Sequence, residues 1–161
     1  MANKDEISIV WDGLQEFSKE LDGMTKELEK NLMEAMTEYL KLVEEGAKAL
    51  VHYDEGELEQ SLTTKGPRRE GDRVVGEIGS NLTYAFRRHE EPYRYGVRDK
   101  YDNGVRTPNY YVYGRGRETL KKPKWRGQAP GRKYLENAVV LTEDDYEKIM
   151  AKALEKTLGG K

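Results

Sequence analysis

The sequence has 161 residues, no cysteine and a formal net charge of −2. This length predicts one domain with a modest core, and the hydrophobic and charged fractions, both 36%, leave much polar surface for partners. The absence of cysteine excludes disulfides, thiolate metal sites and thiol redox chemistry. No apolar run approaches the roughly 18 residues of a membrane span or forms a signal-peptide core, so we expect a protein made and used in soluble form, without membrane contact.

The two parts of the chain have opposite charge. Residues 1–62 contain six Lys against sixteen Asp and Glu, a net charge of −10, whereas the remainder has a net charge of +8. Such polarity either holds one chain together or steers copies of it against each other or against other charged surfaces.

The N-terminal third predicts helices after one short strand. Alternation of Ile7, Ile9 and Trp11 predicts an edge or lead-in strand. From Leu14 the apolar residues recur at steps of three and four, with an interruption at Asp22-Gly23, which predicts a short helix and then a long one over 24–51. That helix, about 40 Å long, either packs partly on another subunit or is the main core helix laid across a sheet.

A hinge, defined here as residues 51–62, joins this helical part to a β-rich part through an Asp54-Glu55-Gly56 turn. A helical turn over 57–60 is expected, and strands over 61–64 and 74–78 should form a hairpin around a polar loop at 66–72. Asn81 is expected to cap a short segment that reaches Glu91.

Residues 93–128 predict a long loop rich in Tyr, Arg and Gly. Between residues 97 and 126 it holds nine Lys and Arg against three acids, and only residues 110–113 have the character of a strand. A loop of this length in a compact domain is usually functional or disordered.

The C-terminal part predicts two helices. The first is a short amphipathic helix over 133–140, and the second opens at a capping box of Thr142 and Asp145 and ends at Gly159-Gly160. The fold class is therefore α+β, with a long N-terminal helix and a C-terminal helix packed on a small, mainly antiparallel sheet. We divide a single domain, 1–161, into an acidic helical part (1–53), the hinge and hairpin (54–92), the long basic loop (93–128) and a C-terminal helical part (129–161).

The residues give no catalytic, cofactor-binding or metal-binding site. His52 and His89 are the only histidines, and the His89-Glu90-Glu91 run lacks the second His of a zincin motif. The run Gly114-Arg115-Gly116-Arg117 has no strand-loop-helix frame for phosphate binding. No triad is present, so we predict that the chain is not an enzyme.

The basic aromatic loop instead predicts a binding partner. Lys and Arg interleaved with Tyr and Trp suit nucleic acid, and the same residue types dominate protein interfaces. The candidate interface residues are Arg98, Arg106, Tyr110, Tyr111, Tyr113, Arg115, Arg117, Lys121, Lys122, Lys124, Trp125 and Arg126.

Three segments carry a family resemblance: DEGELEQSL at 54–62, VVGEIGSNLTYA at 74–85 and APGRKYLENAV at 129–139. In this order, between a long helix and a final helix, they resemble the tail-completion, or head-tail joining, proteins of long-tailed bacteriophages. The residues matched to the family's hinge and fold motifs are Asp54, Gly56, Leu58, Gly79, Tyr84, Pro130, Tyr134 and Leu135. The chain departs from the pattern at Glu55, where the family has Thr, and in the segment after Ala85.

The resemblance implies a structural virion protein without turnover or cofactor. It would be made in the host cytoplasm and assemble at the head-tail junction as a ring, a hexamer in this family, between head-closure or connector proteins and the tail terminator or tail tube. DNA would pass through without specific binding. The alternative is a nucleic-acid-binding protein that uses the basic aromatic loop, and its affinity would fall steeply with salt. An enzyme using Tyr or Glu is a third, weaker alternative.

Overall fold

The structure is a computed structural model that describes residues 7–11, 26–71 and 73–159, with the side chains described from residue 26 onward. Its longest element is helix α2 (Lys26–Leu50), close to the predicted 24–51. The short helix predicted over 14–22 lies outside the described residues.

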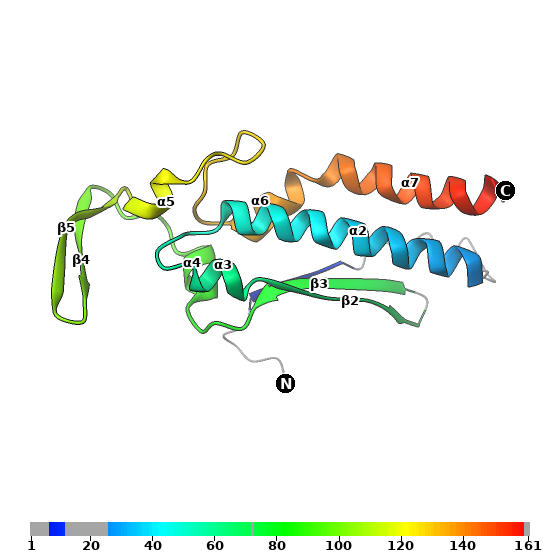
Figure 1. The fold of residues 1–161 in the computed structure, drawn as a ribbon, viewed down its shortest axis with the longest axis horizontal. Helices are drawn as coiled ribbons and strands as arrows, with labels where there is room; N and C mark the ends of the chain where they lie inside the picture. Colours follow the sequence, from blue (N-terminus) through cyan, green and yellow to red (C-terminus); the bar gives the residue numbers. More distant parts are fainter. Residues whose placement is uncertain (1–6, 12–25, 72, 160–161) are drawn as a thin grey trace.

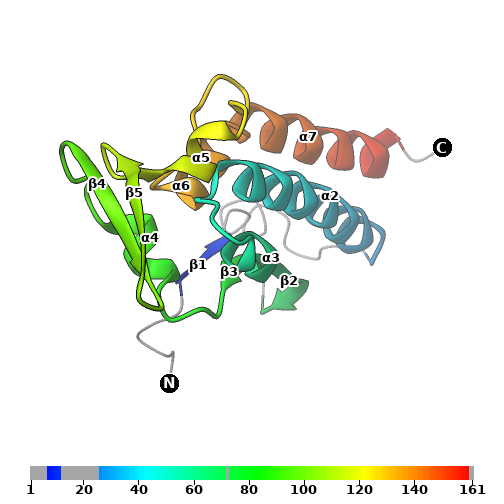
Figure 2. The same cartoon turned by 60° about the vertical axis from the view of Figure 1, so that its left-hand side comes forward.

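Helix α2 lies between a sheet and a helical layer (Figure 1). The sheet has the order β1-β3-β2, from strands β1 (Ile7–Trp11), β3 (Arg73–Ser80) and β2 (Thr63–Glu70), all antiparallel. On the other side, helix α7 (Glu143–Gly159) runs beside α2 in both views (Figures 1 and 2), after helix α6 (Tyr134–Val140). The predicted α+β class is confirmed.

The apolar stripe of α2 is buried within one chain. Leu32, Met36, Tyr39, Val43 and Ala47 are almost fully buried because the sheet and the C-terminal helices cover the stripe from two sides. The stripe therefore forms the main core, as in the simpler of the two interpretations of its length.

The hairpin differs from its predicted boundaries. β2 runs to Glu70 because residues 66–70, predicted as a polar loop, continue to pair with β3 after a register shift between Lys65 and Arg68. An exposed edge strand does not need apolar residues, so the hydrophobic pattern underestimated its length. β1 is an edge strand of the same sheet, as predicted.

The predicted loop 93–128 is mostly ordered secondary structure, which corrects the prediction. Strands β4 (Val97–Asp102) and β5 (Val105–Val112) form a hairpin with the short β6 (Arg115–Gly116), and helix α5 (Arg117–Lys121) follows. Asn103 and Gly104, with φ of 47° and 78°, close the hairpin because both residue types accept positive φ. We call residues 97–112 the arm, which projects from one end of the molecule (Figure 1).

Two predicted helix caps are wrong. Helix α4 (Ala85–Glu90) begins after Tyr84, which gives no side-chain cap, so Asn81 is not its N-cap. The Thr142 hydroxyl donates to the carbonyl oxygen of Ala138 at 2.7 Å, and Asp145 pairs with Arg126, so these two side chains are engaged outside a capping box. Thr142 therefore bonds to the preceding helical turn and Asp145 to a tertiary partner, in place of the predicted capping box.

Candidate functional site

The hinge brings the body, the arm and α4 together. The chain turns at Gly56, whose φ of 88° suits glycine, before helix α3 (Glu57–Ser61) begins. Leu58 is buried beneath this turn. Thr119 of α5 fastens the hinge from the other side, because its hydroxyl accepts from the Tyr53 amide at 3.0 Å and lies 3.1 Å from the Tyr53 carbonyl.

Asp54 joins the hinge to the arm. Its carboxylate accepts hydrogen bonds from Lys100 of β4 and Tyr110 of β5, each at 2.5 Å. Burial acts to raise the Asp54 pKa, but the hydrogen bonds from Lys100 and Tyr110 outweigh it and lower that pKa. The hydrogen bond to Asp54 raises the pKa of Lys100, and burial followed by the same carboxylate raises that of Tyr110. At neutral pH, Asp54 is therefore ionised and paired with the charged Lys100, and we call Asp54 the anchor of the arm.

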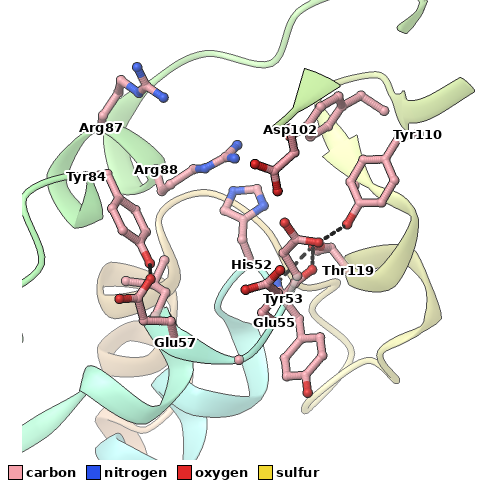
Figure 3. A pocket seen from close by; sticks show the side chains of 15 residues that line it. His52, Tyr53, Glu55, Glu57, Tyr84, Arg87, Arg88, Asp102, Tyr110 and Thr119 are labelled. Atoms are coloured by element: carbon pink, nitrogen blue, oxygen red, sulfur yellow. Dashed lines mark hydrogen bonds between the residues drawn. The ribbon is translucent and has the colours of Figure 1, made fainter. Parts of the chain in front are cut away.

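Helix α4 forms the opposite wall of a pocket of about 340 Å³. Tyr84 donates to Glu57 at 2.6 Å, and Arg88 extends from α4 toward His52 (Figure 3). Burial and then the Glu57 bond raise the pKa of Tyr84 to about 12. The hinge and α4 are thus joined by the Tyr84–Glu57 hydrogen bond, and the charge of Arg88 also acts on Asp54 and helps to lower its pKa.

His52 lies between two pockets and is held neutral. Burial, followed by the charges of Arg88 and Arg115, lowers its pKa to about 4. Among the residues that the structure describes, no three His, Asp, Glu or Cys side chains are grouped as a metal site would require. No helix among them has the length and apolarity of a membrane span.

The sign of the His52 shift predicts a pH dependence of stability. Because the folded pKa lies below the ordinary value of 6.5, the unfolded chain takes up the proton first as pH falls. The contribution of His52 to the free energy of unfolding should therefore be constant above about pH 6.5 and fall toward pH 4. The His52→Gln variant should lose about 1–2 kcal/mol less than the parent between pH 7 and pH 5, allowing for the partial exposure of the ring. Urea unfolding at both pH values measures this, and equal losses would contradict the assignment.

A second prediction concerns Asp54. Asp54→Ala removes the acceptor of both Lys100 and Tyr110, so the arm should open more often. Amide exchange in β4 and β5 should accelerate about tenfold, while α2 stays protected. Asp102→Ala is the matched control, because its carboxylate lies 3.8 Å from Lys100 and is 55% exposed. Equal acceleration in both variants would exclude Asp54 as the anchor.

The predicted interface residues divide into two groups. Most of the basic ones are engaged inside the chain: Arg106 with Asp99 at 2.6 Å, Lys121 with Glu118 at 2.8 Å, Lys122 with Glu59 at 2.8 Å, Arg126 with Asp145 at 2.5 Å, Arg115 with the Tyr93 hydroxyl at 3.2 Å and Arg117 with the Pro108 carbonyl at 3.0 Å. In the described part of the chain, Arg98 and Lys124 make no ion pair. Four of the eight basic candidates are therefore paired with carboxylates, whereas Arg115 and Arg117 donate to neutral oxygens.

The aromatic members also differ in placement. Tyr110 is only 7% exposed, and its hydroxyl donates to Asp54. Trp125 packs against Gly46 of α2. Tyr111 is half-buried at both pockets, where Arg88 lies 6.0 Å from its ring centroid. Only Tyr113, 60% exposed, presents most of its surface to solvent.

The residues matched to the family motifs are mostly structural. Tyr134 and Leu135 are fully buried, and the Tyr134 hydroxyl donates to the Ala85 carbonyl at 3.0 Å. Pro130 is buried beside the end of α2, where the Gly131 amide donates to Leu50 O at 2.8 Å. Gly79 lies in β3 between its partners on β1 and β2.

Sequence reasoning did not single out Lys100, Arg87 and Arg88 as site residues. Asn103-Gly104 could have revealed Lys100, because a two-residue hairpin turn fixes the register of the arm. No local signal places α4 against the hinge, since that contact depends on the sheet.

Comparison with known proteins identifies one family. A model described as "Bacteriophage HK97-gp10, putative tail-component" matches residues 15–87, which span α2, the hinge, the hairpin and the start of α4. The match ends before the arm and leaves out the segment 129–139 on which part of the resemblance rested. No curated protein and no solved structure matches the chain. Over this part of the chain, the match agrees with the predicted resemblance to tail proteins of bacteriophages.

Proposed function

Over residues 15–87 this chain is a member of the HK97-gp10-like family of bacteriophage tail components, and we propose that it joins head to tail as a ring subunit of the phage neck. In this proposal the ring is a hexamer at the head-tail junction. It contacts the head-closure or connector complex on one side and the tail terminator or tail tube on the other.

The proposal is carried by the internal ion pairs of the basic residues between 97 and 126, which we call the basic cluster. Cations that bind a nucleic-acid backbone strongly must be free to neutralise phosphates. Of the nine Lys and Arg between residues 97 and 126, five pair with carboxylates of the same chain: Lys100, Arg106, Lys121, Lys122 and Arg126. A ring through which DNA passes benefits from such neutralisation, because tight phosphate binding would hinder ejection.

The exposed surface of the arm supports a protein partner. Tyr101 and Val105 at its tip are 72% and 64% exposed, and a hairpin of two or three strands cannot bury them by itself. Exposed apolar side chains gathered on a projecting element are typical of an assembly contact.

Electron microscopy of labelled particles tests this function. A tag on the chain should locate to the head-tail junction, and DNA retention by the purified protein should be weak at physiological salt. Label elsewhere in the virion would overturn the neck assignment. Absence from particles, together with DNA affinity that falls steeply with salt, would favour the nucleic-acid alternative.

A further inference from the structure

A second pocket, of about 410 Å³, lies where the arm meets α4 and is strongly basic. Arg87, Arg88, Arg94 and Arg98 line it together with two acids, Glu91 and Asp99. The Asp99 carboxylate is already occupied, because the Arg106 side chain and the Asn109 amide both donate to it. The pocket therefore carries uncompensated positive charge and suits carboxylates of a partner.

Two exposed aromatic side chains lie next in sequence to residues that line this pocket, Arg94, Gly96 and Gly114. Tyr95 and Tyr113 are 89% and 60% exposed, and their rings meet edge to face with centroids 6.5 Å apart. The Tyr113 amide donates to the Gly96 carbonyl at 2.9 Å, which fixes the backbone beside both tyrosines. Preorganised Tyr beside Arg is the composition of protein-interface hot spots.

We propose that this arm-root surface, comprising Arg87, Arg94, Tyr95, Arg98 and Tyr113, docks on an acidic corner of a second copy of the chain, comprising Val140, Glu143, Asp144 and Glu147. The proposal rests on the ring function and names the two surfaces that would form the contact between subunits.

The acidic corner complements the arm-root surface in charge and polarity. Val140, at the end of α6, is 61% exposed. Glu143, Asp144 and Glu147 of α7 are exposed and, within the described residues, make no ion pair. Their neighbour Asp145 is already bound to Arg126, which leaves the outer carboxylates for a partner. The acidic corner thus offers an apolar side chain and three carboxylates to the tyrosines and arginines of the arm-root surface.

The positions of the two surfaces require two copies. The arm and α7 lie apart in both views, with α5 and α6 between them (Figures 1 and 2). A contact between two different surfaces of identical chains is head-to-tail, and it builds a closed ring when the rotation between subunits allows closure.

The pocket fits carboxylates on a protein better than a nucleic-acid strand. Glu91 and Asp99 interrupt the arginines, so the site offers no uniform row of cations to consecutive phosphates. Arg94 and Arg87 both lie near Glu91, with side-chain atoms 3.1 and 3.6 Å from its carboxylate, so no continuous track of free cations crosses the site.

Cysteine cross-linking tests the contact. Because the chain has no cysteine, only the introduced thiols can react. The full chain carrying Arg98→Cys and Asp144→Cys, treated with a short bis-maleimide, should give a ladder of dimers and higher oligomers. Lys65→Cys with Asp144→Cys is the matched control, because Lys65 is an exposed residue on β2 outside the proposed contact. It should give dimers at most, as should each single variant.

Charge reversal supplies the second measurement. Arg98→Glu or Asp144→Arg alone should weaken self-association in sedimentation at least tenfold, and the double variant should recover to within about threefold. Absence of the ladder from both the concentrated protein and assembled particles would overturn the proposed contact. The contact would also be overturned if Arg98→Glu lost DNA retention but kept the self-association of the parent. Label at the head-tail junction without a ladder refutes the contact alone, whereas a ladder without label refutes the neck function alone.

Discussion

Lys122→Met should lower the free energy of unfolding by about 2–4 kcal/mol. The Lys122 ammonium donates to the carbonyls of Lys48 and Val51, at 2.7 and 3.1 Å, and to Glu59 at 2.8 Å. Those two carbonyls lie at the C-terminal end of α2. Backbone acceptors there lack helical partners, and the helix dipole favours a cation. Methionine keeps the stem but leaves three oxygens without this donor, and bonds to a charged group are each worth roughly 1.5–3 kcal/mol. Urea unfolding measures the change.

The neighbouring lysine provides the control. Lys121 pairs with Glu118 one turn away and is 64% exposed, so Lys121→Met should change stability by no more than about 0.5 kcal/mol. Both variants remove one positive charge from the basic cluster. If Lys122→Met instead leaves stability unchanged and weakens assembly, Lys122 is an interface residue, as the sequence predicted.

Lys122 illustrates why the candidate site was only partly predictable. Composition identified a basic aromatic segment, but it could not show which cations find partners inside the chain. That depends on residues 63–74 positions away, Glu59, Val51 and Lys48, which the hinge brings beside the segment. Pairing of this kind follows from tertiary structure and has no local sequence signal.

The elements that were predicted well have strong local patterns. The stripe of α2 repeats at helical spacing over 25 residues, so its existence and approximate ends follow from the sequence. The sequence of the arm predicts a loop because Val97, Tyr101 and Val105 stay exposed, and a strand without a buried face shows no clear alternation. Its turn, Asn103-Gly104, is the local sequence signal for a hairpin at this place.

Trp125 is another predicted interface residue that is part of the fold. Its ring lies over Gly46 of α2, where an added Cβ would lie 2.5 Å from the nearest ring carbon. The Trp125 backbone is fixed by hydrogen bonds in both directions with Gln128, at 3.0 and 2.9 Å. Arg126 stacks on the ring at 4.8 Å while its side chain bonds to Asp145. The ring therefore cannot withdraw without disturbing these contacts.

Gly46→Ala should consequently destabilise the protein by about 1–3 kcal/mol, the usual range for overpacking a filled site. The sign is informative, because the same change in an open helix interior stabilises by roughly 0.8–1 kcal/mol. Thermal or urea unfolding of Gly46→Ala and the parent measures it. A stabilised variant would mean that the ring does not occupy this position.

A double-mutant cycle separates the clash from any other effect of the Gly46→Ala substitution. In a Trp125→Ala background the space above α2 is empty, so Gly46→Ala should become stabilising by about 0.5–1 kcal/mol through helix propensity alone. The coupling energy between the two positions should then be about 2 kcal/mol or more, as expected for residues in direct contact. Additive effects would place Trp125 away from α2 and leave its ring free for the partner surface that the sequence suggested.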